Sequence, residues 1–308
     1  MKKIKILIVG GTGFIGYHLA RRAVKEGWQV TSISTNKPKK IRKISKVRYL
    51  LCDISSKKSL KKKLKIKFNY VVNLGGYVDH TNSKKVYKSH YLGCVNLIQL
   101  LIKNPPLTFV QMGSSGEYGK LKSPHKEYFE CKPISIYAKS KLLASKYLLK
   151  MYKKNNFPSV ILRLYQSYGP KQDQNRFIPF VIASCLMNKN FPCSDGKQFR
   201  DFLHVDDVVE AIIKSLNNKN AIGEIFNLGT GKPKKIKDII YKLNKFIKKG
   251  NPEFGKIKMR KDEYKKIFPS IKKANIKLKW YPKISFAKGL KQTIKFYDDY
   301  YKSKSTSG

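Results

Sequence analysis

The stretch IKILIVGGTGFIG, residues 4–16, decides the fold. Its first half is a short apolar run, typical of a buried parallel strand, and its second half carries glycines in the spacing GxxGxxG. Glycines there let the chain turn sharply and bring backbone N–H groups against a pyrophosphate at the start of a helix. We therefore predict a dinucleotide-binding turn. Its predicted cofactor contacts are Gly10, Thr12, Gly13, Phe14, Ile15 and Gly16.

Apolar runs alternate with helical patterns through the first half of the chain. Strands are predicted over 30–34, 47–51, 70–74, 108–112 and 159–164, and helices over 14–26, from about 55, over 91–101 and over 137–153. Strands that alternate with helices indicate a parallel sheet with both faces covered. The predicted fold class is therefore α/β, a doubly wound parallel sheet of the Rossmann type with a smaller C-terminal lobe.

The pattern loosens after Gly169-Pro170, and this change sets the predicted domain boundaries. Residues 1–166 are predicted to form the NAD(P)-binding domain. Residues 200–230 would return to it through a strand over 202–205, a helix over 207–216 and a strand over 224–228. The smaller substrate-binding lobe is predicted to comprise 167–199 and 231–301, followed by a frayed tail at 302–308.

The formal net charge of +47 is the most unusual feature of the composition. Lysines are spread along the whole chain, whereas there are only eight arginines. A protein dedicated to binding nucleic acid is expected to use more arginine, because the planar guanidinium group of arginine contacts phosphate and guanine through pairs of hydrogen bonds. We therefore interpret the lysines as solvated surface, which also helps to attract an anionic substrate, and expect no nucleic-acid partner.

The five cysteines are scattered and include no CxxC pair, so neither a metal site nor a disulfide framework is predicted. The apolar run after Met1 is too short for a signal peptide, and no stretch approaches the roughly 20 apolar residues of a membrane helix. A soluble, cytoplasmic protein without a membrane partner is expected.

The end of the second predicted strand bears on the choice of cofactor. An acidic residue there accepts hydrogen bonds from the adenosine ribose of NAD, but this chain has Ser34-Thr35-Asn36-Lys37. No carboxylate would repel a 2′-phosphate, so NADP(H) is favoured, with NAD(H) as the alternative. Asp53 is a candidate partner for the adenine amino group, or a cap for the next helix. Further predicted cofactor contacts are Ser34, Thr35, Lys37, Ile54, Leu74 and Gly75.

Tyr137 and Lys141 are spaced by one helical turn, so both side chains lie on one face. A nearby ammonium favours phenolate and is expected to lower the tyrosine pKa toward working pH. The tyrosine can then exchange a proton with a substrate while a hydride moves at the same carbon. Ser114 follows the fifth strand, at the sheet edge where such folds bind ligands, and its hydroxyl can hydrogen-bond the reacting oxygen.

A series of ordered motifs resembles those of the extended short-chain dehydrogenase/reductase family, the NAD-dependent nucleotide-sugar epimerases, dehydratases and reductases. They are GGTGFIG at 10–16, VNLGG at 72–76, SSGEYG at 114–119, the Tyr137/Lys141 pair, the segment 163–170, RDFLHVDD at 200–207, NLGTG at 227–231 and LKW at 278–280. The resemblance covers essentially the whole chain.

The resemblance implies a nicotinamide-dependent enzyme with Ser114, Tyr137 and Lys141 as the catalytic set. Lys141 would also hydrogen-bond the nicotinamide ribose. The family's C-terminal lobe holds a nucleotide diphosphate, and the matching positions are Arg200 and Arg260, for which an ion pair with Asp206 or Asp262 is the alternative role. The residues expected to contact substrate are Ser115, Gln166, Arg176, Arg200 and Arg260.

Departures from the family pattern reduce the number of reactions of the family that fit this chain. Similar dehydratases carry an acid directly after the catalytic hydroxyl, where this chain has Ser115-Gly116, and Glu117 is expected to point elsewhere. Gln166 and His90 stand where epimerases carry Asn. The segment GSSGEYG resembles reductases of 4-keto-6-deoxy sugars linked to CDP or dTDP, so NADPH-dependent reduction is favoured.

Other functions stay open at this point. A 4-epimerase with bound NAD comes second, ahead of a sugar 4,6-dehydratase and of a non-catalytic NADP- or RNA-binding relative. The helices over 91–101 and 137–153 match those that pair in the family's dimers, so a homodimer is expected.

Overall fold

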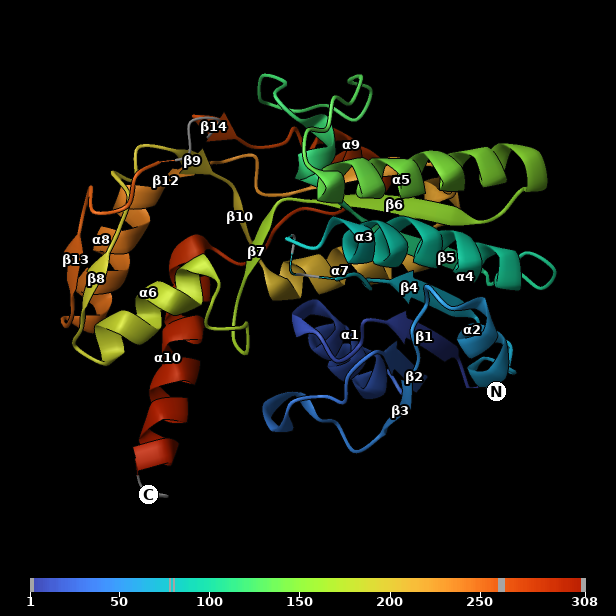
Figure 1. Cartoon of the computed structure of the whole chain (residues 1–308), viewed down its shortest axis with the longest axis horizontal. Coiled ribbons are helices and arrows are strands. Elements are labelled where there is room, and N and C mark those ends of the chain that lie inside the picture. Colours follow the sequence, from blue (N-terminus) through green and yellow to red (C-terminus); the bar gives the residue numbers. More distant parts are fainter. Residues whose placement is uncertain (1–2, 78, 80, 260–263, 306–308) are drawn as a thin grey trace.

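The computed structural model describes residues 3–77, 79, 81–259 and 264–305. Its centre is a seven-stranded parallel sheet in the order β11-β6-β5-β4-β1-β2-β3 (Figure 1). The strands are β1 (Lys5–Val9), β2 (Gln29–Ser34), β3 (Val47–Leu51), β4 (Tyr70–Asn73), β5 (Thr108–Ser114), β6 (Ser159–Leu164) and β11 (Ile225–Leu228). The predicted fold class is confirmed.

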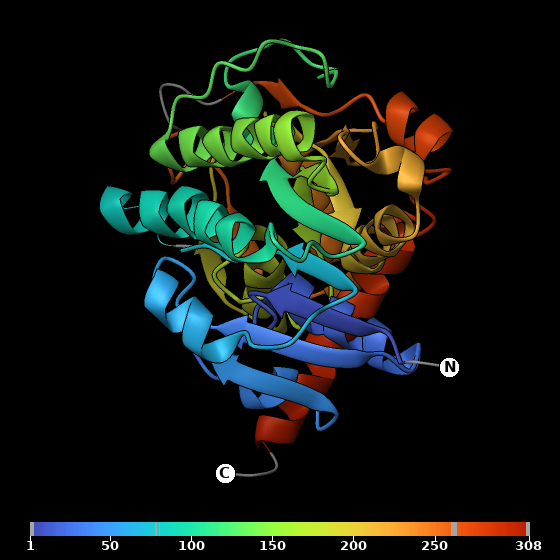
Figure 2. The same ribbon diagram turned by 90° about the vertical axis from the view of Figure 1, so that its right-hand side faces the viewer.

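Helices cover both faces of this sheet. One face carries α2 (Lys57–Lys63), α3 (Ser83–Tyr87), α4 (Gly93–Leu101) and α5 (Ile136–Asn155), and the other carries α1 (Phe14–Lys25) and α7 (Val205–Leu216). The two views agree that α4 and α5 lie side by side (Figures 1 and 2). The near-continuous apolar strands fit this arrangement, because both faces of the sheet are buried.

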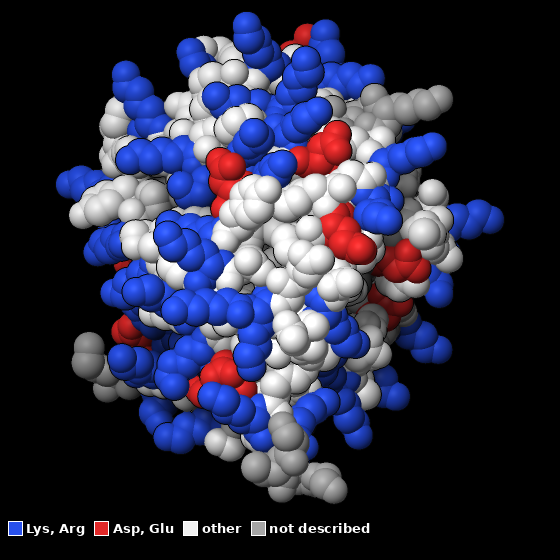
Figure 3. Space-filling model, turned by 90° about the vertical axis from the view of Figure 1, so that its left-hand side faces the viewer, with Lys and Arg blue, Asp and Glu red and all other residues white. Residues whose placement is uncertain are grey.

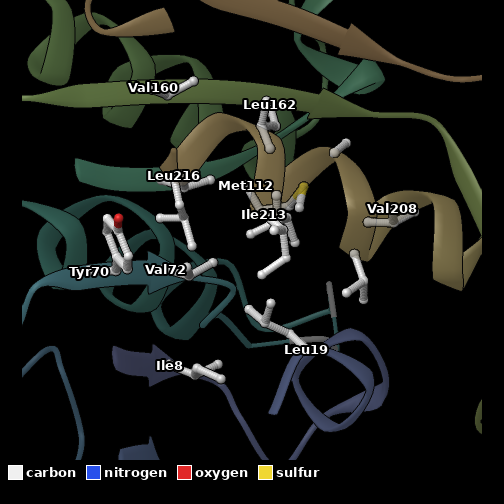
Figure 4. Packing of buried hydrophobic residues seen from close by; sticks show 14 of the residues in the cluster. Ile8, Leu19, Tyr70, Val72, Met112, Val160, Leu162, Val208, Ile213 and Leu216 are labelled. Atoms are coloured by element: carbon white, nitrogen blue, oxygen red, sulfur yellow. The ribbon is translucent and has the colours of Figure 1, made fainter. Parts of the chain in front are cut away.

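Aliphatic side chains fill the layer between the sheet and the α1/α7 pair (Figure 4). Ile8, Val72 and Met112 come from three neighbouring strands. They pack in one cluster with Leu19 of α1 and Ile213 of α7. Each such side chain contributes about 1.5–3 kcal/mol when fully buried. This packing fixes the strand ends, and therefore the loops that follow them, relative to the helices.

The remaining elements form a smaller lobe beside the carboxyl ends of the strands (Figure 1). Its helices are α6 (Phe177–Leu186), α8 (Ile236–Ile247) and α10 (Phe286–Ser305), which share one apolar cluster. Its short strands are β7 (Gln166–Tyr168), β8 (Asn190–Pro192), β9 (Phe199–Arg200), β10 (Phe202–His204), β12 (Lys234–Lys235), β13 (Asn251–Glu253) and β14 (Lys266–Ile267).

Three details differ from the sequence-based expectations. The run predicted as a returning strand over 202–205 is β10, which pairs with β7 outside the main sheet, and the return is made by α7 and β11. The segment 272–280, placed in the smaller lobe, includes α9 (Lys272–Lys277), and Ala274, Leu278 and Trp280 pack in the core of the sheet. The tail predicted to fray from residue 302 continues α10 through Ser305.

The strand order reverses between β1 and β4, and this switch point positions the site. The chain builds β2 and β3 on one side of β1 and then β4, β5 and β6 on the other, so the loops after β1 and β4 diverge. In open α/β sheets such a crevice at the carboxyl ends is where ligands bind. Within the described residues, none of the helices is long and apolar enough to span a membrane, and no group of three potential metal ligands occurs.

Candidate active site

The glycine turn between β1 and α1 is shaped by close backbone contacts. Gly10 has φ +75°, and a Cβ there would lie 3.0 Å from the backbone nitrogen of Gly75, at the end of β4. A Cβ on Gly16 would lie 2.3 Å from the Gly10 carbonyl oxygen. Helix α1 starts after Gly13 with no side-chain cap and no acidic residue in its first turn. Its first N–H groups therefore fit the pyrophosphate of a dinucleotide.

The end of β2 is held next to this turn. The Ser34 hydroxyl lies 3.4 Å from the Thr12 backbone nitrogen, while Thr35 and Lys37 are exposed. Lys39 is engaged elsewhere, since its ammonium lies 2.6 Å from a carboxylate oxygen of Asp173. Hydroxyl and ammonium groups, and no carboxylate, are thus available where an adenosine ribose would lie.

The loop after β3 is held by hydrogen bonds from helix α4. Asn96 of α4 donates its side-chain amide to the carbonyls of Ile54 and Ser55, at 3.1 and 3.0 Å. Asp53 is exposed and accepts the Ser55 backbone N–H at 2.8 Å, and the cap of α2 is Ser56 rather than Asp53. The carboxylate therefore keeps one oxygen for an adenine amino group. Leu74 and Gly75 follow β4 on the other wall of the crevice.

Ser114, Tyr137 and Lys141 are brought together by β5 and α5. Ser114 is the last residue of β5, and Tyr137 is the second residue of α5, whose first turn is capped by Ser135. The Ser114 and Tyr137 side chains hydrogen-bond each other. One turn along α5, the Lys141 ammonium donates a 2.7 Å hydrogen bond to the Met112 carbonyl and lies 5.9 Å from the Tyr137 ring centroid.

The electrostatics of this trio correct one expectation. Burial raises the pKa of Tyr137, and the charge of Glu117 adds to the rise, while the hydrogen bond with Ser114 and the charge of Arg176 oppose it. Burial also lowers the pKa of Lys141 to about 8. The net pKa of Tyr137 is thus raised rather than lowered as expected, because burial dominates, and the Lys141 ammonium is hydrogen-bonded to the Met112 carbonyl. Tyr137 is therefore a protonated phenol at neutral pH in this arrangement.

A histidine forms the wall behind the tyrosine. His90 lies in a π-helical turn over Lys88–Leu92, a local widening that is frequent at functional sites. Its ring packs edge-to-face on Tyr137 with the centroids 5.0 Å apart. On the other side it touches Gly76, where a Cβ would lie 1.8 Å from the ring. The imidazole thus fills space that a smaller Asn would leave open.

Glu117 turns into the protein interior, as expected, and is fully buried. One carboxylate oxygen accepts the Ser114 backbone N–H at 2.8 Å. The other accepts the Arg163 Nε–H at 2.9 Å and the Ser145 hydroxyl at 3.1 Å. Arg163 had no expected role, although an arginine inside a strand of otherwise apolar residues is a signal of a buried ion pair.

The residues expected to contact substrate lie around the crevice at different depths. Ser115 is half-buried in a 3-10 turn, Gln166 is exposed on β7, and Arg176 is exposed at the start of α6. Arg200 is about nine-tenths buried, and its guanidinium donates to the carbonyls of Phe199 and Tyr264 at 2.7 and 2.8 Å. Burial lowers the pKa of Arg200 to about 10.

Asp206 and Asp262 are the alternative ion-pair partners expected for Arg200 and Arg260. Asp206, one alternative partner of Arg200, lies 3.7 Å from the imidazoles of His18 and His204. Arg260 and Asp262 lie outside the described residues.

A model of the NAD-dependent epimerase/dehydratase family matches residues 6–229 of this chain. The chain belongs to that family. Among curated relatives of the family, a putative UDP-glucose 4-epimerase of Methanocaldococcus jannaschii is 29% identical over 304 residues, which cover 94% of this chain and 97% of that protein. The CDP-abequose synthase of Salmonella typhimurium is 27% identical over 303 residues, with coverages of 94% and 97%.

Solved structures of the family share the architecture. The UDP-glucuronic acid 4-epimerase of Bacillus cereus, in complex with UDP-glucuronic acid and NAD, has a TM-score of 0.86 at 26% identity, and the match covers 97% of this chain and 100% of that one. The UDP-glucose 4-epimerase of Thermotoga maritima has a TM-score of 0.91 at 24% identity, with coverages of 97% and 100%, a likeness of fold alone.

Family membership confirms the predicted resemblance and the predicted enzyme class. The chain is an NAD(P)-dependent enzyme of the extended short-chain dehydrogenase/reductase type, with an activity in the nucleotide-sugar epimerase/dehydratase family. The relatives are named for different reactions, so family membership does not specify which reaction this chain catalyses.

Proposed function

We propose that this enzyme uses NADPH to reduce the 4-keto group of a nucleotide-activated 6-deoxyhexose linked to CDP or dTDP. The observation that carries the proposal is the environment of Ser114 at the end of β5. Ser115 and Gly116 follow it, and Glu117 turns into the interior to pair with Arg163, so no acid stands beside the reacting hydroxyls. Tyr137 lies next to Ser114 as a phenol and can serve as the proton donor that a reduction needs.

The chain's residues would act on the substrate in a fixed order. The C4 carbonyl would lie between the hydroxyls of Ser114 and Tyr137, which polarise it by hydrogen bonding. A nicotinamide cofactor held by the glycine turn would supply the hydride for that carbon. Tyr137 then gives its proton to the new alkoxide, so the carbonyl becomes an alcohol by gaining one hydride and one proton. The Lys141 ammonium stabilises the phenolate that is left behind.

The absence of an acid beside Ser114 supports reduction over dehydration. Eliminating water requires an additional acid and base next to the catalytic hydroxyl. In this chain those places hold Ser115 and Gly116, and Glu117 is paired with Arg163 in the interior.

The preference for NADP(H) rests on the end of β2. Ser34, Thr35 and Lys37 offer two hydroxyls and one ammonium to a 2′-phosphate. A reductase exchanges its cofactor at every turnover, and NADPH is the reducing form that cells maintain. Arg200 and Arg176 would bind the diphosphate of the substrate. The guanidinium of Arg200 is buried and would regain charge stabilisation from phosphate oxygens, and that of Arg176 is exposed at the start of α6.

A 4-epimerase with firmly held NAD is the second candidate, and the names of the relatives favour it. In that reaction NAD, when bound, would accept the hydride from C4 and return it, while the same trio would remove and restore the proton of the C4 hydroxyl. The bulky ring of His90, packed on Tyr137, and the exposed Gln166 depart from the Asn residues expected of such enzymes.

A homodimer in the cytoplasm is part of the proposal. Leu143 on α5 is 39% exposed, and Tyr147 and Met151 on the same helix are only partly buried. Paired α4/α5 helices from two copies would cover these side chains.

The cofactor found with the purified protein tests the proposal. We expect protein without retained nucleotide, tighter binding of NADPH than of NADH, and oxidation of NADPH with CDP- or dTDP-4-keto-6-deoxyglucose. Stoichiometric NAD that survives purification, together with interconversion of UDP-sugars, would replace the reductase by the epimerase.

A further inference from the structure

We infer that Glu117, held by Arg163, is a positioning residue that sets the geometry of Ser114 relative to α5. The inference rests on the proposed function only in taking Ser114, Tyr137 and Lys141 as the reacting site. It concerns two side chains that do not reach the crevice, since Glu117 is fully buried and Arg163 is 3% exposed.

The first contact fixes the serine. The Glu117 carboxylate accepts the backbone N–H of Ser114 at 2.8 Å, while the Ser114 hydroxyl accepts the Gly116 N–H at 3.1 Å. These two bonds hold the main chain and the side chain of Ser114 in one short turn. Gly113 is part of the same fit, because a Cβ there would lie 2.6 Å from a Glu117 oxygen.

The second contact reaches the helix that carries the tyrosine and the lysine. Ser145 lies on α5 one turn beyond Lys141, and its hydroxyl donates to the other Glu117 oxygen at 3.1 Å. A single carboxylate therefore links the end of β5 to α5. Because the carboxylate group is rigid, the two bonds fix the relative placement of Ser114 and the helix.

The third contact holds the carboxylate in place. Arg163 of β6 donates its Nε–H at 2.9 Å, and its guanidinium packs over the Tyr118 ring, 4.7 Å from the centroid. Burial alone would lower the pKa of Arg163, but the Glu117 charge together with Tyr118 and Cys131 more than offsets this, so the pKa is raised. A buried pair of this kind adds little net stability compared with apolar residues of similar volume. A role in geometry accounts for it better than a role in stability.

The charge of Glu117 also acts on the site. It raises the pKa of Tyr137 and counters the fall in the pKa of Lys141 that burial causes. The other groups facing Tyr137 are the imidazole of His90 at 5.0 Å, the ammonium of Lys141 at 5.9 Å from the ring centroid, and the guanidinium of Arg176. Removing the Glu117 charge therefore removes one of the influences that raise the pKa of Tyr137, and its phenol should titrate at lower pH.

The test replaces the whole pair, because removing Glu117 alone would leave a buried guanidinium without its carboxylate. The double variant Glu117→Leu/Arg163→Met keeps the volume and removes both charges. Glu127→Gln is the matched control. Glu127, like Glu117, lies between β5 and α5 and accepts a backbone N–H, that of Asn227 at 2.9 Å. Ser145→Ala removes only the link to α5.

Two readouts need no substrate and therefore test the inference independently of the reaction. Carbon-13 NMR of ring-labelled tyrosine, assigned with Tyr137→Phe, reports the titration of Tyr137, and amide hydrogen exchange reports the Ser114 N–H. In the double variant we expect Tyr137 to titrate at lower pH, and the Ser114 N–H to exchange faster, than in the wild type. In Ser145→Ala we expect both Ser114 exchange and Tyr137 titration close to wild type.

Turnover provides the third readout. For whichever nucleotide-sugar reaction the wild type catalyses, the double variant should lose about tenfold to a hundredfold in kcat with little change in KM. Ser145→Ala should lose about threefold, and Glu127→Gln nothing. A folded double variant with wild-type Ser114 exchange, Tyr137 titration and kcat would overturn the inference. Should that variant not fold, an unchanged kcat in Ser145→Ala would overturn it. Failure of every 4-keto sugar as substrate would instead count against the proposed reductase alone.

Discussion

The ammonium of Lys141 lies 2.7 Å from the carbonyl oxygen of Met112, and the strand β5 that carries Met112 ends two residues later at Ser114. The lysine is 4% exposed, so it carries its charge in a poorly solvated place. Burial lowers its pKa to about 8. One hydrogen bond thus couples the helix of Tyr137 to the strand of Ser114, and it makes the protonation of Lys141 sensitive to pH near neutrality.

This burial predicts an unusual effect of Lys141→Met on stability. The pKa of Lys141 is about 8 in the folded protein and about 10.4 in an unfolded chain. Between these values the unfolded chain binds more protons, so wild-type stability rises with pH, and the full penalty of the buried charge is present below pH 8.

The variant should therefore lack activity but melt about 3 °C higher than wild type at pH 7. The difference should shrink as pH rises from about 8 to above 10. Thermal melts of both proteins across this range check it. A difference that stays constant with pH would show that packing, not the charge, is responsible.

Tyr137→Phe removes the proposed proton donor and leaves the ring in place against His90. We expect kcat to fall by about 10²- to 10⁴-fold, the usual contribution of general acid catalysis. Cofactor affinity should change little, which a fluorescence titration with NADPH checks. Near-normal turnover of the variant would remove Tyr137 from the mechanism.

Ser34→Asp places a carboxylate at the end of β2, where NAD-dependent relatives of this fold class carry an acid. The new charge should repel a 2′-phosphate and weaken NADPH binding by at least about tenfold, or 1.4 kcal/mol. NADH binding should stay equal or improve, which makes it the internal control. Equal losses for both cofactors would mean that the substitution damages the turn at Thr12 and does not report on the phosphate.

Lysine and arginine side chains are spread over much of the face shown in Figure 3, around a central area of other residues, and they outnumber the carboxylates there. With a formal net charge of +47, the protein should attract a dianionic nucleotide sugar before contact. Raising ionic strength from roughly 20 to 200 mM should lower kcat/KM about threefold or more while kcat changes little. Salt-independent kcat/KM would show that the surface charge has no part in substrate capture.

The sequence predicted the sheet well because its signals are local. Strand β1 and the glycine turn are specified within residues 4–16, and strand β6 was predicted with the bounds it has in the structure. The sequence also predicted Ser114, Tyr137 and Lys141 as a set, because the helical spacing of the last two and the end of the strand before Ser114 are both visible in local sequence patterns. How these groups act is still a proposal.

The errors have a common physical origin in contacts between distant segments. β10 is a short apolar run like any other strand, and only the position of β7 decides that it stays outside the main sheet. The pKa of Tyr137 is dominated by its burial and by the charge of Glu117, and the i, i+4 spacing to Lys141 specifies neither. Glu117 and Arg163 are separated by 46 residues, so their pairing is not visible in any local pattern.

The central claim is tested most directly by following the hydride. The enzyme would be incubated with NADPH deuterated at the transferred position of C4 and with CDP- or dTDP-4-keto-6-deoxyglucose, and the product sugar examined by NMR and mass spectrometry. The account predicts one deuterium at C4 of the sugar for each NADPH oxidised. NADPH left unoxidised, with bound NAD and epimerisation of a UDP-sugar without any label from NADPH, would contradict it.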